Sequence, residues 1–544
     1  MDLFVIEAPM KARTLENLLA RLGFSAKVQA TKGHFFQMPK SLETVGIDVQ
    51  MREFARVGDA GIIQRLRAEA QIADNVIIAT DADAEGDVIA WDVAEVIRDI
   101  HPNPLRVRLR ALDDVSVKEA INAAVPVSKA DAVAGRTRAI IDRMIGAGFS
   151  RPDLSVGRVG TALLGLLDKA KPSVFKMQLV APSKDGGRPW MAEAPCTAPF
   201  DESVGRRLVA LQFPMLAIGS QRTICPPPGH TGDCMVRAVD QLDMSPLEAS
   251  DAMQNLYEVG RLSYPRAGSR GMSTASAARV AELLRKAGYN TDPTKIASKA
   301  PEGVHDSPHP IGKVDLNSPP AQLGHAEGVR ALIARDLVKS GQTYIEETAV
   351  AAGLIPFLTS HGFSPAVAQA VASLNWRRES GPRYPGQNSW PKSELQERRA
   401  DAVILEMAVE ANLGRPSTWG KHIERFMSRN LIDDRMRLTA KGRAWLARSP
   451  AELLDPRVSA AIEMACERPR PDAFTDPSRE PWEINAERIV KALPPGLRQP
   501  LERMVAHEPA RPKVDPVEAL GLRNSTLAEI EARDASPAYV PQEN

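Results

Sequence analysis

Three acidic side chains alternate in the segment DADAE at residues 81–85, directly after the apolar run NVIIAT at residues 75–80. Alternate residues of an extended chain point to the same side, so the three carboxylates would lie close together and repel one another. A divalent cation would offset that repulsion. A site made only of carboxylate oxygens suits Mg²⁺, which keeps several waters and often also contacts phosphate. The segment therefore predicts a magnesium site formed by Asp81, Asp83 and Glu85.

Two other interpretations of this segment compete with a metal site. Acids in the first turn of a helix also complement the helix dipole, without any ligand. The string D-x-D-x-x-G further matches the start of an EF-hand loop, but its fifth position is Glu85, its twelfth is Asp92 instead of glutamate, and the preceding element is a strand. These differences exclude the EF-hand, and dipole complementation stays open.

The elements that would position these acids indicate an α/β fold. LFVIE at residues 3–7 and NVIIAT are apolar and β-prone, and a segment with helical periodicity follows each of them. Strands that alternate with helices predict a parallel sheet over about the first 125 residues. Ligands bind at the carboxyl edge of such sheets. Glu7 ends the first strand and Lys11 follows one helical turn later, so both are expected near the acids.

The remainder of the chain is mostly helical, with irregular segments between the helices. Helical patterns cover about 128–170, 244–340 and 394–467, whereas residues 175–240 are rich in Pro and Gly with short β-like runs. From about residue 505 the chain is Pro-rich and poor in large apolar residues, which predicts a largely unstructured tail.

Composition limits the partners and the compartment. A chain of 544 residues exceeds one core and predicts about three to five domains. A formal charge of +1 gives no overall basic field, so any nucleic-acid surface must be local. The cysteines form no C-x-x-C pair, which argues against structural zinc and disulfides and favours a cytoplasmic protein. No signal peptide, membrane-spanning run or G-x-x-x-x-G-K-[ST] loop is recognised.

Glu7, Lys11 and the D-x-D-x-E run together resemble the Toprim domain, a magnesium-dependent module shared by topoisomerases, bacterial-type primases and some nucleases. The resemblance is specific because it joins two separate strand ends in the right order. It adds Glu7 to the expected metal ligands.

Further motifs resemble the type IA DNA topoisomerases. Residues 253–269, MQNLYEVGRLSYPRAGS, are similar to the active-site segment of that family, with Tyr264 on the nucleophile and Arg266 on the arginine beside it. The other matches, in family order, are TKGHFFQMP (31–39), RAIIDRMIG (138–146), LSVGRVGTALL (154–164) and LGRPSTWGKHIERFMSRNLI (413–432). The resemblance extends over about residues 1–470.

This resemblance implies a multidomain fold, in which an α/β Toprim domain with a Rossmann-like parallel sheet precedes a discontinuous, largely helical four-domain torus without zinc ribbons. The implied domains are a Toprim domain (1–127), a helical base domain (128–176 and 396–490), an arch or connector domain with β-structure (177–240 and 340–395), a helical domain with the catalytic tyrosine (241–339) and a largely disordered tail (491–544).

The implied activity is ATP-independent cleavage of one DNA strand through a 5′-phosphotyrosine, followed by strand passage and religation, in a monomer. A tyrosine hydroxyl with a pKa of about 10 needs neighbouring positive charge to attack a phosphodiester. Arg266 and Lys11 would stabilise charge on the phosphate, Glu7 would protonate the leaving 3′ oxygen, and Mg²⁺ would position the 3′ end for religation. The residues expected to contact single-stranded DNA are Arg138, Arg158, Gln254, Glu258, Arg415, Ser417 and Thr418.

The chain departs from the family pattern at several positions. The family histidine lies in a degraded string, where His309 is favoured over His305 because Pro310 and Ile311 follow it. The other departures are Ala84 for arginine, Asp87 for glutamate, Gly160 for glutamine and Ala267-Gly268 for Thr-Asp. None of them removes the nucleophile or an acid of the D-x-D-x-E run.

Three alternatives remain beside the topoisomerase interpretation. Each arginine of the expected groove could be an ordinary helix-surface charge. The chain could be another Toprim enzyme, a primase or nuclease, although neither class uses a tyrosine nucleophile. It could also be a catalytically impaired, topoisomerase-derived protein that binds single-stranded DNA.

Overall fold

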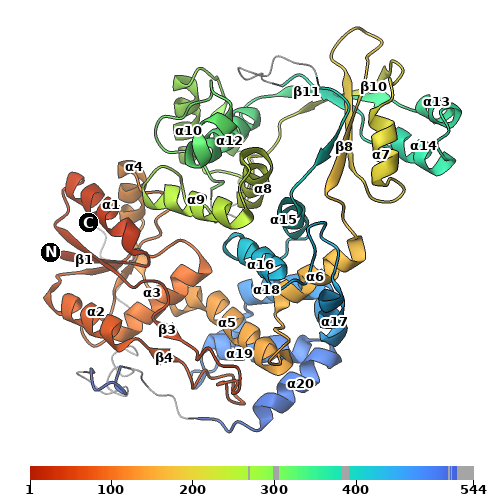
Figure 1. Cartoon of the computed structure of the whole chain (residues 1–544). Helices are drawn as coiled ribbons and strands as arrows, with labels where there is room; N and C mark the ends of the chain where they lie inside the picture. The colour runs from red at the N-terminus through yellow and green to blue at the C-terminus, as the bar shows by residue number, and fades with distance from the viewer. Residues whose placement is uncertain (267–269, 298–305, 382–390, 512–514, 516, 524–544) are drawn as a thin grey trace. The chain divides into compact units, whose positions relative to one another are not determined.

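The computed structural model describes most of the chain in two compact units (Figure 1). Unit 1 combines residues 1–162 and 258–260 with the chain from residue 448 onward, and unit 2 contains residues 163–257 and 261–447. The described residues are 1–266, 270–297, 306–381, 391–511, 515 and 517–523. No helix within these ranges is both long enough and apolar enough to cross a lipid bilayer.

Unit 1 begins with a five-stranded sheet in the order β2-β1-β5-β6-β7. Four strands run parallel, and β7 pairs with β6 in the antiparallel sense. The strands are β1 (Asp2–Ile6), β2 (Ala26–Ala30), β5 (Val76–Ile78), β6 (Leu105–Arg106) and β7 (Val125–Pro126). The parallel α/β sheet predicted from the sequence is confirmed, except at β7, where Pro126 suits an edge because it has no N–H to donate.

Helices cover both faces of this sheet. Leu3 and Val5 of β1 share one core cluster with α2 and α3, so these helices cover one face. Phe4 and Ile6 alternate with them and are also buried, so they point to the opposite face, where α1 contacts β2 and α4. The helices are α1 (Pro9–Arg21), α2 (Ala60–Ile72), α3 (Ala84–Ile97) and α4 (Asp114–Asn122), and a two-stranded sheet of β3 (Phe36–Gln37) and β4 (Val57–Gly58) lies between β2 and α2 in the chain.

A helical layer completes unit 1, centred on α5 (Lys129–Phe149), which packs against α3 (Figure 1). A Cβ on Gly135 of α5 would lie 2.5 Å from the Ala84 carbonyl oxygen, so glycine allows the two helices their close approach. The other contacts of α5 come from far along the chain, from α18 (Pro456–Glu467), α19 (Pro481–Ala492) and α20 (Pro495–Ala506), and the short helices η2 (Ala451–Leu454) and η3 (Pro471–Phe474) lie near them in sequence.

The end of the chain is more ordered than the sequence predicts. The prediction of a largely disordered tail from residue 491 is wrong for α20 and for residues 517–523, while residues 524–544 lie outside the described part. Val517 is fully buried in the core of the first sheet. Arg523 shares Asp99 with Arg67, and all three side chains are almost completely buried. Low local hydrophobicity cannot reveal such long-range contacts.

Unit 2 contains a six-stranded antiparallel sheet in the order β10-β11-β12-β9-β8-β13. Its strands come from two separate stretches of the chain, 175–224 and 344–397. The strands are β8 (Phe175–Ala181), β9 (Trp190–Pro195), β10 (Ala217–Ile224), β11 (Tyr344–Val350), β12 (Arg377–Glu379) and β13 (Glu394–Glu397), with helices α7 (Glu202–Val209), α13 (Leu354–Ser360) and α14 (Pro365–Ala372) beside them in sequence.

The rest of unit 2 is helical, and α8 links its parts because it contacts both α12 and α15. The helices are α8 (Thr231–Leu242), α9 (Pro246–Glu258), α10 (Thr274–Lys286), α11 (Pro293–Ala297), η1 (Pro320–Gln322), α12 (Gly324–Ser340), α15 (Ala400–Glu410), α16 (Pro416–Ser428) and α17 (Ala440–Arg448), while α6 (Arg158–Ala170) begins in unit 1 and ends in unit 2.

The Asp99 cluster gives a test of the docked tail. Asp99→Asn leaves Arg67 and Arg523 buried without their shared anion, so unit 1 is expected to lose about 3–5 kcal/mol of stability. Chemical denaturation of the full chain should show the loss, and residues 507–523 should become sensitive to protease. Glu282→Gln, which breaks an exposed pair with Arg285, is the control and should change neither readout. A tail that stays protected in Asp99→Asn would contradict the docking.

Candidate active site

The acidic run of unit 1 begins at the carboxyl end of β5 and continues into the first turn of α3. Asp81 is 1% exposed, whereas Asp83 is half-buried and Glu85 is exposed. Asp83 is the N-cap of α3, where its carboxylate accepts a hydrogen bond from the Gly86 N–H at 2.8 Å. Dipole complementation therefore describes part of what Asp83 does. It does not account for the burial of Asp81.

Close packing fixes the shape of this loop. Thr80 donates its hydroxyl to the Gly86 carbonyl at 2.7 Å. A Cβ on Gly86 would lie 2.1 Å from the Asp81 carbonyl oxygen, so no other residue fits without moving the backbone. Thr80 and Gly86 were not among the predicted site residues, although their place at a strand–helix junction was visible in the sequence.

Glu7 and Lys11 both lie against Asp81. Lys11 forms an ion pair with Asp81 in which each side chain is only 2% exposed. Burial raises the pKa of Glu7 to about 9, and the charge of Asp81 and a hydrogen bond with it add to that rise. Two strand ends that are distant in sequence thus bring two carboxyl groups and one ammonium group together, beside the half-buried Asp83, which also raises the pKa of Glu7.

The chemistry of these groups fits a magnesium ion. Glu7 and Asp81 offer only oxygen donors, and their mutual repulsion is what a divalent cation would relieve. Mg²⁺ is commonly held by one or two carboxylates with waters completing its shell. Within the described ranges, however, no three Asp, Glu, His or Cys side chains are grouped closely enough to hold a metal. The predicted set of Asp81, Asp83, Glu85 and Glu7 is therefore not assembled as one cluster here.

Glu85 faces another feature, a cavity of about 450 Å³ in unit 1. It is lined by residues of the β3 region, α3 and α5, including Arg138 and Asp142. Arg138 pairs with Glu463 at 2.8 Å, and Arg158 pairs with Glu463 and Asp142, both at 2.9 Å. The two predicted DNA-binding arginines are thus held in one ion-pair network, which the sequence did not reveal because Glu463 is so distant along the chain.

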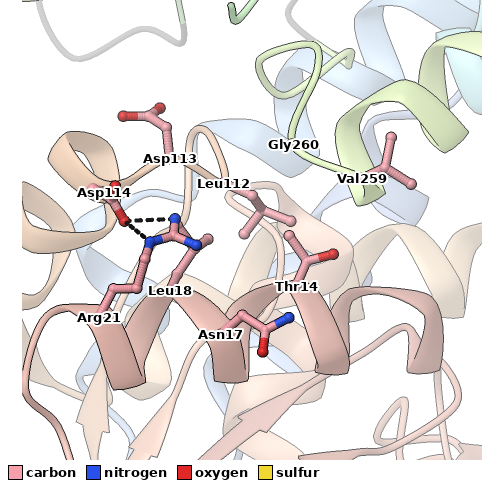
Figure 2. Close-up of a pocket in the computed structure, with 9 residues that line it drawn as sticks. All are labelled: Thr14, Asn17, Leu18, Arg21, Leu112, Asp113, Asp114, Val259 and Gly260. Atoms are coloured by element: carbon pink, nitrogen blue, oxygen red, sulfur yellow. Dashed lines mark hydrogen bonds and ion pairs between the residues drawn. The ribbon is translucent and has the colours of Figure 1, made fainter.

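A smaller cavity of about 370 Å³ lies between α1 and the residues around the start of α4 (Figure 2). Arg21 reaches Asp114 there at 2.8 Å, and Asp113 caps α4. Gly260 completes the wall with a positive φ of 72°, and its Cβ would lie 2.5 Å from the Leu112 carbonyl oxygen. None of the predicted site residues lines this cavity.

In unit 2, the Tyr264 segment is held by backbone pairing with the His309 segment. The Ser263 N–H donates to the His309 carbonyl, and the His309 N–H donates to the Ser263 hydroxyl, both at 2.9 Å. Tyr264 is 3% exposed, and its ring meets that of Tyr257 edge-on at 5.4 Å between centroids. The structure thus places His309 beside the tyrosine, whereas His305, Ala267 and Gly268 lie outside the described residues.

The remaining predicted residues lie on α9, at the start of α16 and just after Tyr264. Gln254 and Glu258 are on α9, which leads to the tyrosine segment, and Arg266 is half-buried. Arg415, Ser417 and Thr418 are also half-buried, and Thr418 accepts a hydrogen bond from the Arg415 N–H at 3.2 Å. These two elements touch, because a Cβ on Gly420 of α16 would lie 2.8 Å from the Leu247 backbone.

The chain is similar to known proteins in sequence and in fold. The Toprim domain family matches residues 2–112. Reverse gyrase 2 of Aeropyrum pernix is 27% identical over 68% of this chain and 33% of its own length. A plasmid DNA topoisomerase I of Xylella fastidiosa is 27% identical over 56% of this chain and 50% of its own. DNA topoisomerase 1 of Aquifex aeolicus is 26% identical over 53% of this chain and 56% of its own.

Full-length topoisomerase I from Thermotoga maritima has the same fold, with a TM-score of 0.57 at 17% identity over 90% of this chain and 89% of that one. Residues 2–112 therefore form a Toprim domain, and the chain as a whole has the fold of topoisomerase I. The chain contains a Toprim domain and is similar in sequence to DNA topoisomerase I and to reverse gyrase. It spans between about a third and somewhat more than half of the length of the curated relatives above.

The packing at Gly86 gives a test of the acidic loop. Gly86→Ala places a methyl group against the Asp81 carbonyl, so unit 1 should lose about 1–3 kcal/mol. Gly61→Ala is the matched control, because Gly61 also lies in a first helical turn but its Cβ would meet only the Asp59 carboxylate at 3.4 Å. Thermal unfolding of both variants checks the difference. Equal stability of the two variants would mean that the loop tolerates a Cβ.

Proposed function

We propose that this chain is an ATP-independent type IA DNA topoisomerase. It cleaves one DNA strand through a 5′-phosphotyrosine at Tyr264, passes a strand through the break and religates it, relaxing negative supercoils or decatenating DNA. The main support for the proposal is the Tyr264 segment, in which a buried tyrosine follows Ser263, a residue hydrogen-bonded to His309. The same chain also contains the buried group of Glu7, Lys11 and Asp81. Primases and nucleases of the Toprim type do not use a tyrosine nucleophile.

The Tyr264 hydroxyl loses its proton to solvent as its oxygen bonds to the phosphorus. The bond from phosphorus to the 3′ oxygen breaks with its electron pair on that oxygen, which takes a proton from Glu7. Arg266 and Lys11 stabilise the negative charge on the phosphate. Religation reverses each step, and the bond energy kept in the phosphotyrosine replaces ATP.

Glu7, Asp81, Asp83 and Glu85 are the proposed Mg²⁺ ligands, and binding of the ion would have to gather them into one cluster. When bound, Mg²⁺ supplies positive charge that orients the 3′ end for religation. His309 keeps its Nδ1 proton directed at the Ser307 carbonyl at 3.0 Å, because a carbonyl can only accept. That bond fixes the orientation of its ring beside the tyrosine.

Single-stranded or negatively supercoiled DNA is the proposed partner. Arg415, Ser417 and Thr418 stand at the start of α16, where backbone N–H groups favour an anion. Gln254 and Glu258 on α9 are further proposed contacts, and so are Arg138 and Arg158 once phosphate competes with their carboxylates. The proposed compartment is the cytoplasm, where the four cysteines, none of which is in a disulfide, would stay reduced, and the proposed state is a monomer.

The assignment of the nucleophile can be tested with single-stranded oligonucleotides labelled at one end. Wild-type protein should become covalently attached to a single-stranded oligonucleotide labelled at its 3′ end, and not to one labelled at its 5′ end. Tyr264→Phe keeps the ring against Tyr257 but removes the nucleophilic oxygen, so the adduct should vanish while binding persists. Tyr257→Phe is the control and should still form the adduct. A wild-type level of adduct in Tyr264→Phe would rule out this nucleophile.

The acids can be tested separately from the tyrosine. Asp81→Asn combined with Asp83→Asn keeps side-chain size and the α3 cap but removes two charges, so plasmid relaxation should be lost while cleavage persists in part. Asp113→Asn makes the same change at the N-cap of α4 and should relax plasmid normally. Assays with Mg²⁺ and with excess EDTA check both. Relaxation that is unaffected by the double change or by EDTA would remove the metal site.

A further inference from the structure

Arg106, on β6, is one of the largest fully buried side chains in unit 1, and it lies directly under the acidic loop. Its side chain is 1% exposed. Its guanidinium donates to the carbonyls of Thr80 at 2.8 Å, Asp81 at 2.7 Å and Val107 at 2.6 Å. Two of these three acceptors belong to the turn that presents the predicted metal ligands.

The Asp81 carbonyl is therefore held from two directions. Nη2 of Arg106 binds its oxygen, and Gly86 packs so close to that oxygen that a Cβ would lie at 2.1 Å. These contacts fix the backbone at Asp81, whose carboxylate meets Lys11 and Glu7. A planar guanidinium can reach two successive carbonyls at once, whereas the single ammonium group of lysine cannot keep that geometry.

A network of ion pairs with Asp87, Arg108 and Asp131 holds the Arg106 guanidinium in place. Its Nε and Nη2 both reach Oδ1 of Asp87 at 3.1 Å. Arg108 reaches the same oxygen at 3.1 Å and Asp131 of α5 at 2.9 Å. Burial raises the pKa of Asp87 and lowers the pKa of Arg106, and each charge opposes the shift of the other. Because buried charges are destabilising unless they are paired, Arg106 and Asp87 each need the other in place.

We propose that Arg106 is a positioning residue for the acidic loop: its hydrogen bonds to the Thr80 and Asp81 carbonyls set the orientation of the Asp81 carboxylate and thereby the affinity of unit 1 for a divalent cation. It deepens the proposed function, on whose metal site it rests. Arg106 touches neither substrate nor metal. Partners of this kind typically change metal affinity by about 10–100-fold when they are replaced.

The test measures metal binding in the full-length protein without DNA, by titration with MgCl₂ in a calorimeter and with Mn²⁺ followed by electron paramagnetic resonance. Arg106→Lys keeps the charge but loses the fork, so its affinity for both ions should fall at least about tenfold. Arg67→Lys is the matched control, because Arg67 is also buried in unit 1, donates to the Val96 carbonyl and pairs with Asp99. It should lower the thermal stability without changing the metal affinity.

A second variant guards against misfolding of Arg106→Lys. Asp87→Asn leaves Arg106 in place but removes its anchoring charge, so metal affinity should again fall, by less than in Arg106→Lys. Wild-type metal affinity in both variants, or the same fall in Arg67→Lys, would overturn the proposal. The topoisomerase proposal is tested separately, by whether wild-type protein forms the Tyr264 adduct in EDTA. Wild-type protein that binds metal but forms no adduct would remove that function and leave the role of Arg106 standing.

Discussion

Lys11 and Asp81 form an ion pair in which each side chain is only 2% exposed, and Glu7 lies against the same carboxylate. Burying such charges costs several kcal/mol for each ion unless every one has a partner. The three residues come from β1, α1 and the end of β5, so the pairing requires adjacent parallel strands that end at one edge. The positions of α1, the turn at Thr80 and the start of α3 all follow from this requirement.

The features that could be predicted from the sequence are those set by local patterns. Apolar runs followed by helical periodicity indicated the parallel sheet, and Glu7, Lys11 and the acidic run were expected at its carboxyl edge. The partners of buried charges could not be predicted, because they are chosen by packing across hundreds of residues. Nothing in the sequence indicates that Arg138 pairs with Glu463 or that Arg523 pairs with Asp99.

The same limit explains why Arg106 was not predicted to matter. In the string RVRLR its arginines alternate, so they should point to one side of a strand, as solvated charges often do. In the structure, Arg106 is buried under the acidic loop, while Arg108 remains partly exposed. Asp87 accepts hydrogen bonds from both arginines on one oxygen.

Near-neutral composition shapes how such a chain can hold DNA. With 69 basic and 68 acidic residues the chain carries almost no net charge, and Arg138 and Arg158 both pair with Glu463. If DNA is the substrate, as proposed, a phosphate that binds these arginines replaces a carboxylate instead of a counterion from solution. Such an exchange gains less from counterion release than binding to an open basic surface does. Affinity would then depend on how well the groove is shaped for a single strand, and duplex DNA, which lacks that shape, would be held weakly.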